Sequence, residues 1–100
     1  MATNDESSEL YDVIIVGAGV SGATAAYTLK KKCPNLKLLV VEAKGRTGGR
    51  TETIQLNCSQ PGKKVTLDAG GQWVTDTQEI ITELINELDI KTYPQFDTGK

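Results

Sequence analysis

The sequence predicts an α/β fold in which two parallel strands flank a helix, followed by a β-hairpin and a second helix. The segment "YDVIIVGAG" is an unbroken run of apolar, mostly β-branched residues that ends in glycines, which is typical of a strand buried on both faces of a sheet. An alanine-rich helix over residues 21–32 follows, and "LKLLVVE" at residues 36–42 is a second buried strand. A strand, a helix and a strand in this order predict parallel pairing with a crossover helix.

The first helix has a clear end in the sequence. Cys33 precedes Pro34, and proline disfavours the helical conformation in the residue before it. The basic run at residues 30–32 fits the last turn of the helix, where cations suit the helix dipole. We therefore interpret these lysines as a solvated helix end rather than as a binding site.

A hairpin insertion and an amphipathic helix are predicted in the second half of the chain. "TETIQL" alternates polar and apolar residues and can pair with "KKVTLD" across the turn-rich "NCSQPG". In "DTQEIITELINEL", Asp76 and Glu79 have the spacing of an N-cap and its capping-box partner. One face of this helix is apolar, which indicates core packing rather than a ligand site; it carries Ile80, Ile81, Leu84, Ile85 and Leu88.

Composition limits the classes of function. The chain has 100 residues, 38% of them apolar, with a formal net charge of -2 and no histidine, which fits a soluble globular domain or a piece of one and argues against nucleic-acid binding. Cys33 and Cys58 stand alone, so neither a metal site nor a disulfide framework is expected. No segment is apolar enough to be a signal peptide or to span a membrane, so an intracellular, cytoplasmic protein is expected. A C-terminal membrane anchor beyond residue 100 stays an open alternative.

The chemistry begins with the hexad "GAGVSG" at residues 17–22, which matches G-x-G-x-x-G between the first strand and its helix. Gly17 is expected to make the tight turn, Gly19 to let the backbone touch a pyrophosphate, and Gly22 to let the helix press on the sheet. The positive helix N-terminus then faces the phosphates. This context predicts a Rossmann-like dinucleotide-binding unit; the alternative is a simple glycine-rich turn.

A carboxylate follows at the expected distance. Glu42 closes the second strand about 20 residues after the hexad, where an acid accepts hydrogen bonds from an adenosine ribose. Its charge would repel a 2′-phosphate, so NADP is disfavoured. The alternative is an exposed glutamate at a strand end.

The stretch "EAKGRTGGR" places Arg46 and Arg50 around Gly48 and Gly49, just past the carboxyl end of a parallel strand. Ligands of open α/β sheets bind at this edge, and arginine pairs with phosphate oxygens through its planar fork. A nicotinamide fold needs no second anchor, so the run indicates a longer ligand across the sheet edge. A flexible surface loop with incidental charges is the alternative.

A second glycine pair occurs in "LDAGGQWV", after a strand-like segment. Trp73 follows it and could lie beside a flat ring of a ligand. Buried tryptophans are usually apolar bulk, so a core position for Trp73 is an equally open alternative.

Together, "DVIIVGAGVSG", "VVEAKGRTGGR" and "LDAGGQWV" resemble the N-terminal segment of the flavin-containing amine oxidase family, over roughly residues 12–93. The resemblance implies bound FAD, with the pyrophosphate at Gly17, Gly19, Ser21 and Gly22 and the ribose at Glu42. It also implies further FAD contacts from Ala43, Arg46, Gly49 and Arg50. The residues that would approach the flavin end are Gly70, Gly71, Gln72 and Trp73. The family oxidises a small amine by hydride transfer to the flavin and reduces oxygen to hydrogen peroxide.

Two departures leave the substrate open. Thr75, Asp76 and Thr77 lead into Gln78 where many relatives carry glycine and proline, and the hairpin loop is longer than in monoamine oxidases. Family members run to several hundred residues, so residues 10–100 are expected to be the N-terminal part of an FAD-binding domain, an incomplete domain after a polar tail at residues 1–9. The substrate domain and the catalytic residues would lie beyond residue 100.

Three alternatives remain from the sequence. The first is another FAD oxidoreductase with the same segment, such as an amino-acid oxidase or a carotenoid desaturase. The second is a catalytically silent dinucleotide-binding module. The third is a nicotinamide dehydrogenase, which explains the hexad and Glu42 but gives Arg46 and Arg50 no purpose.

Overall fold

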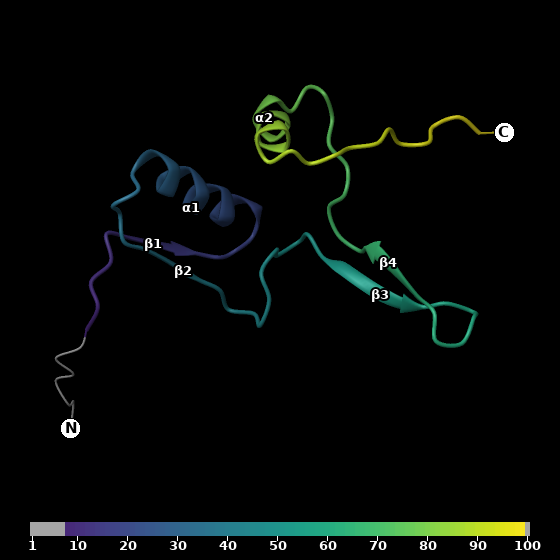
Figure 1. Ribbon diagram of the computed structural model, residues 1–100, viewed down its shortest axis with the longest axis horizontal. Helices are drawn as coiled ribbons and strands as arrows, with labels where there is room; N and C mark the ends of the chain where they lie inside the picture. Colours follow the sequence, from purple (N-terminus) through teal and green to yellow (C-terminus); the bar gives the residue numbers. More distant parts are fainter. Residues whose placement is uncertain (1–7, 100) are drawn as a thin grey trace.

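The structure is a computed structural model that describes residues 8–99, and its elements confirm the predicted α/β order (Figure 1). The elements are β1 (Val13–Val16), α1 (Val20–Lys32), β2 (Leu38–Val41), β3 (Thr53–Asn57), β4 (Lys64–Asp68) and α2 (Glu79–Glu87). Most of the predicted polar tail, residues 1–7, lies outside the described residues, while Ser8 and Glu9 are exposed. Neither helix in residues 8–99 has the length and apolar character needed to cross a membrane.

The βαβ unit is confirmed. β1 pairs with β2 in parallel, from Val13 opposite Leu38 to Val16 opposite Val41. α1 packs against both strands and covers one face of this two-stranded sheet (Figure 1). The helix ends at Cys33 as the following proline predicts, with its lysines in the last turn.

The hairpin is confirmed as a separate two-stranded sheet. β3 and β4 are antiparallel, with Thr53 opposite Asp68 and Asn57 opposite Lys64. Gly62, in the turn between them, has φ of +78°, a conformation that glycine adopts without a steric penalty. The turn-rich segment between the two alternating segments therefore fixes the hairpin, as the sequence indicates.

The predicted capping box of α2 is wrong. The helix begins at Glu79 with Gln78 as its N-cap, and the N-cap side chain makes no capping hydrogen bond. Residues 75–78 instead form a turn, in which the Gln78 amide donates to the Thr75 carbonyl at 3.0 Å and the Thr75 amide donates to Gln78 Oε1 at 3.1 Å. Asp76 lies inside this turn and is too early in the chain to cap the helix.

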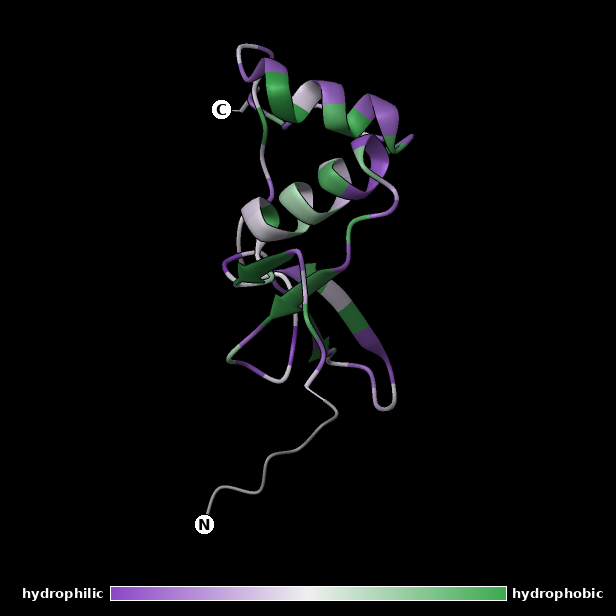
Figure 2. Cartoon of the chain, turned by 90° about the vertical axis from the view of Figure 1, so that its left-hand side faces the viewer, coloured by the Kyte–Doolittle hydropathy of each residue, from purple (hydrophilic) through white to green (hydrophobic). Residues whose placement is uncertain are grey.

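The expectation of strands buried on both faces is also wrong for the described part of the chain. Among residues 8–99, Ala18 is the one buried apolar residue, whereas Ile14 is 57% and Val16 85% exposed. The physical reason is that α1 covers one sheet face and no described element covers the other. The apolar strands stand out in green in Figure 2, and Ile80 on α2 is 81% exposed. The radius of gyration, 19.3 Å, exceeds the roughly 13 Å of a compact 100-residue domain.

Candidate dinucleotide-binding site

The site is built around the glycine-rich turn between β1 and α1. Gly17 has φ of +98°, the left-handed region that glycine tolerates, and its amide donates to the Val41 carbonyl at 2.7 Å. Gly19 is the N-cap of α1, and a Cβ placed on it would meet open space. The turn therefore leaves room at Gly19 for a ligand to approach the backbone.

Gly22 has a different and equally specific reason to be glycine. A Cβ at this position would collide with the carbonyl oxygen of Gly17 and would lie 3.3 Å from Ile15 Cγ2. The first turn of α1 thus lies directly against the glycine-rich turn and β1. This geometry confirms the close packing that the third glycine of the hexad predicts.

Glu42 connects the end of β2 to the same turn. Its Oε2 accepts a hydrogen bond from the Ala18 amide at 2.7 Å, and its Oε1 accepts one from the Lys44 amide at 3.1 Å. The Ala18 hydrogen bond is the main cause that lowers the pKa of the Glu42 carboxyl, with the Lys44 amide next. The carboxylate is therefore ionised at neutral pH and lies at the sheet edge where the sequence places a ribose.

The arginine–glycine loop lies beside the glycine-rich turn. The Gly48 amide donates to the Ala18 carbonyl at 2.8 Å, and Gly48 forms a parallel bridge with Gly19. Gly48 and Gly49 have φ of +102° and +59°, which allows the sharp bend after β2. Two segments separated by about thirty residues thus form one edge beyond the carboxyl ends of β1 and β2, where ligands of open α/β sheets bind.

The two arginines of this loop are placed differently. Arg50 lines the groove at the N-terminus of α1, and its guanidinium makes no hydrogen bond or ion pair with any of residues 8–99. The Arg46 guanidinium points into its own loop, where Nη2 donates to the Gly49 carbonyl at 2.8 Å and contacts Glu52 Oε2 at 3.3 Å. Arg50 is thus available to an anion in the groove, whereas Arg46 is already paired.

The groove itself has a volume of about 440 Å³. Its lining combines the helix N-terminus with both glycine-rich segments, and comprises Val16, Gly17, Gly19, Val20, Ser21, Gly22, Lys44, Gly48, Gly49, Arg50 and Thr51. Lys44 and Thr51 were missed by the sequence prediction; the signal for Lys44 is a cation two residues beyond the strand-ending acid. Several predicted site residues do not line the groove, namely Glu42, Ala43, Arg46, Gly70, Gly71, Gln72 and Trp73.

The second glycine pair contacts the arginine loop. A Cβ on Gly70 would collide with the Arg50 carbonyl oxygen, and the Gly71 amide donates to that oxygen at 3.1 Å. The next two residues contact Tyr93. Gln72 Nε2 donates a hydrogen bond to the Tyr93 hydroxyl at 3.1 Å, and the Trp73 and Tyr93 rings pack edge-to-face with their centroids 5.9 Å apart. Trp73 is 51% exposed, so in residues 8–99 it is not a core residue.

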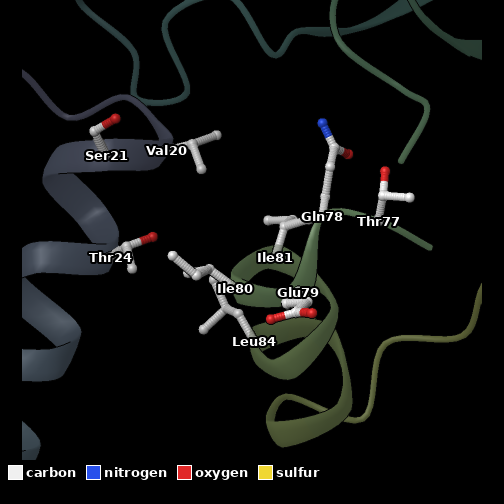
Figure 3. A pocket seen from close by; sticks show the side chains of 9 residues that line it. All are labelled: Val20, Ser21, Thr24, Thr77, Gln78, Glu79, Ile80, Ile81 and Leu84. Carbon is white, nitrogen blue, oxygen red and sulfur yellow. The ribbon is translucent and has the colours of Figure 1, made fainter. Parts of the chain in front are cut away.

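A larger cavity, of about 650 Å³, lies between α1 and α2 (Figure 3). Val20 and Thr24 face it from α1, and the apolar side chains of Ile80, Ile81 and Leu84 face it from α2. Glu79 is the one charged residue in its lining. We place the candidate site in the smaller groove, because the phosphate-binding features of the sequence converge there.

Comparison with known proteins identifies the family to which the chain belongs. The profile of the family described as "NAD(P)-binding Rossmann-like domain" matches residues 15–88. A probable flavin-containing monoamine oxidase A from Dictyostelium discoideum is 44% identical over 93 residues, which are 93% of this chain and 19% of that protein. An L-amino acid dehydrogenase from Synechocystis is 42% identical over 83 residues, 83% of this chain and 16% of that protein.

Among solved structures, wild-type putrescine oxidase bound to putrescine matches with a TM-score of 0.70 and 42% identity. That match covers 83% of this chain and 17% of the putrescine oxidase chain. The chain thus spans less than a fifth of the length of these relatives. These findings confirm the resemblance to flavin-containing amine oxidases, and the chain belongs to the NAD(P)-binding Rossmann-like domain family.

Proposed function

We propose that this chain is the FAD-binding part of a flavin-dependent amine oxidase. The observation that carries the proposal is the position of Arg50, a cation without a partner among residues 8–99, in the groove at the N-terminus of α1. A helix N-terminus and an arginine fork on one groove are suited to a pyrophosphate. The flavin-containing relatives make FAD the dinucleotide to test first.

The residues present fit such a ligand. Gly17, Gly19, Ser21 and Gly22 would hold the pyrophosphate, because the open space at Gly19 admits it to the backbone. Arg50 and Gly49 would contact it from the other side of the groove. Glu42 would receive the adenosine ribose, and its charge disfavours a 2′-phosphate and therefore NADP.

The remaining predicted residues would extend the binding surface beyond the groove. Ala43 and Lys44 follow Glu42 and would border the adenosine end of the ligand. Gly70 and Gly71 contact the Arg50 backbone, so they would support the middle of the groove. Gln72 and Trp73 would lie toward the flavin end, next to Tyr93.

Bound FAD would supply the two-electron oxidation of the substrate, with oxygen as the final acceptor. The residues of this chain bind and orient the cofactor, and none of them is assigned as an acid, base or nucleophile. We propose a small amine as the substrate of the whole protein and an intracellular, cytoplasmic location for it. Amino-acid oxidation is the second candidate, because an L-amino acid dehydrogenase shares this segment at 42% identity.

The test is the visible absorption spectrum of the purified longest polypeptide that the gene encodes, with and without the change Arg50→Ala. Flavin bands are expected in the unaltered protein. The Arg50→Ala variant is expected to lose about tenfold or more in FAD affinity, because a charge-assisted hydrogen bond is worth about 1.5–3 kcal/mol. Loss of the oxidised flavin bands when putrescine, aromatic amines or L-amino acids are added without oxygen then separates the two substrate classes, whichever acceptor reoxidises the flavin.

An unaltered protein without flavin bands, and without FAD uptake in titration, would overturn the proposal. An Arg50→Ala variant with the same FAD affinity as the unaltered protein would refute the role of Arg50 alone. Lys64→Ala, which removes an exposed cation from the distant strand β4, is the matched control. This control should leave FAD affinity unchanged.

A further inference from the structure

We infer that Arg46 and Glu52 are positioning residues, which together hold the loop that carries Arg50 against the glycine-rich turn. The inference rests on the proposed function of the groove and goes beyond it, because it assigns a role to Glu52 and changes that of Arg46. In place of the ligand role expected for both arginines, Arg50 faces the ligand and Arg46 builds the loop.

Both terminal nitrogens of the Arg46 guanidinium have partners within its own loop. Nη2 donates to the Gly49 carbonyl at 2.8 Å and lies 3.3 Å from Glu52 Oε2. Nη1 donates to the carbonyls of Thr47 at 3.2 Å and Thr51 at 3.3 Å. One planar fork thus collects three carbonyls and a carboxylate, which a single ammonium group could not reach together.

The loop closed by Arg46 is a tight one. The Thr51 amide and the Thr51 hydroxyl both donate to the Gly48 carbonyl, at 3.0 Å and 2.7 Å. Gly48 in turn donates to the Ala18 carbonyl of the glycine-rich turn. Arg50 lies within this closed segment, so its position relative to the helix N-terminus depends on the fold of the loop.

Glu52 connects the loop to the hairpin. Its side chain contacts Arg46, and its carbonyl accepts a hydrogen bond from the Ala69 amide at 2.8 Å. The Arg50 carbonyl accepts one from the Gly71 amide. The Arg46–Glu52 pair therefore lies where the arginine loop is hydrogen-bonded to the segment that follows β4.

A direct role for Arg46 in phosphate binding makes opposite predictions. If Arg46 were a ligand, Glu52 would compete with the phosphate for it, and neutralising Glu52 would leave FAD affinity unchanged or raise it. If Arg46 is a positioning residue, neutralising Glu52 loosens the loop and lowers FAD affinity. The two roles thus differ in the sign of one measured change.

The experiment compares Arg46→Ala, Arg46→Lys, Glu52→Gln, the double variant Arg46→Ala/Glu52→Gln and Arg50→Ala in the longest polypeptide that the gene encodes. FAD affinity is measured at several salt concentrations. We expect Glu52→Gln to weaken FAD binding severalfold, Arg46→Ala to weaken it about tenfold, and the double variant to match Arg46→Ala. Arg46→Lys should resemble Arg46→Ala, because lysine keeps the charge but not the fork.

Salt dependence separates contact from positioning. Arg50→Ala should flatten the dependence of FAD affinity on salt, because a cation next to the phosphates is lost. Arg46→Ala should leave this slope as it is in the unaltered protein. An equally flat slope for both variants, or unchanged or tighter FAD binding by Glu52→Gln, would overturn the inference.

Amide hydrogen exchange of the ligand-free protein gives a readout that needs no cofactor. In Glu52→Gln the amides of Gly48, Thr51 and Gly71 should exchange faster than in the unaltered protein. In Glu83→Gln, a matched control on α2, their exchange rates should not change. Unchanged exchange in Glu52→Gln would refute the positioning role even if no FAD binds. Absence of FAD binding in the unaltered protein, with faster exchange in Glu52→Gln, would overturn the proposed function and leave the loop assignment supported.

Discussion

The carboxylate of Glu42 accepts a hydrogen bond from the Ala18 amide at 2.7 Å, across 24 residues of sequence. One end of β2 is thereby joined to the turn that opens α1. The same carboxylate also accepts the Lys44 amide, so both of its oxygens are held by backbone donors. Glu42 thus orders the groove through its backbone contacts, in addition to the ribose contact that its position predicts.

This arrangement predicts a specific dependence of stability on pH. The pKa of Glu42 is lowered from its ordinary value of 4.5, chiefly by the Ala18 hydrogen bond. Because the pKa is lower in the folded than in the unfolded protein, the ionised Glu42 contributes its full stabilisation at pH values above 4.5. This stabilisation is lost as the pH falls through the lowered pKa of the folded state. Glu42→Gln should therefore be less stable than the unaltered protein at pH 7, and the difference should shrink below about pH 4.

The measurement is the urea midpoint of both proteins, in the longest polypeptide that the gene encodes, at a series of pH values. Glu83→Gln is the control, since this glutamate lies exposed on α2. It should show the same pH profile as the unaltered protein. A difference between Glu42→Gln and the unaltered protein that stays constant down to pH 3 would contradict the assigned contact.

Gly22→Ala should disrupt the site through backbone crowding. The added Cβ would collide with the Gly17 carbonyl, so either the turn or the helix must shift, at a cost of about 1–3 kcal/mol. Gly45→Ala is the matched control, because its Cβ would meet open space. Gly22→Ala should lower both the melting temperature and the FAD affinity, whereas Gly45→Ala should change neither. Equal effects of the two variants would show that close packing at Gly22 does not determine stability or FAD binding.

The pattern of the sequence was enough to predict the βαβ unit and the hairpin, because each depends on local signals. β-Branched runs, the hexad and the turn residues "NCSQPG" all act within a few positions of where they stand. The capping box failed because Gln78 pairs with Thr75, and a spacing of acid and acid cannot reveal that competing turn. The burial prediction failed because it depends on elements that residues 8–99 do not supply.

The candidate site was likewise predicted only in part. The sequence predicted that Glu42, the hexad and the arginine loop share one edge, since the carboxyl ends of parallel strands meet there. It did not predict that Arg46 would turn inward to Gly49 and Glu52 while Arg50 faces the groove. Two arginines four residues apart have the same chemistry, and only the path of the loop decides which carbonyls lie within reach.

The second glycine pair offers a comparison between neighbours. Gly70→Ala should lower both stability and FAD affinity, because its Cβ would collide with the Arg50 carbonyl. Gly71→Ala should be tolerated, since its Cβ would lie 3.6 Å from Thr51 Cγ2, an ordinary contact. Flavin content and the melting temperature of both variants test this difference. A Gly71→Ala variant that is as damaged as Gly70→Ala would mean that the pair acts through flexibility rather than through space.

Residues 1–100 prepared alone should not unfold cooperatively. Val16 and Ile80 are 85% and 81% exposed, and Ala18 is the one buried apolar residue among residues 8–99, so these elements have little core to hold them together. The isolated chain is expected to bind a hydrophobic dye and to unfold without a sharp thermal transition. A cooperative transition with a strong near-ultraviolet signal from Trp73 would contradict this.

Ile80→Ser distinguishes exposed apolar surface from surface that becomes covered in a longer polypeptide. In the isolated chain the change should leave the unfolding curve nearly unaltered and reduce dye binding, because the side chain has no packing to lose. In the longest polypeptide that the gene encodes it should cost about 2–4 kcal/mol, the typical loss for truncating a buried isoleucine. Glu83→Ser, on an exposed position of the same helix, should cost far less in both. Equal effects of Ile80→Ser in the two proteins would show that the apolar face of α2 stays open in both.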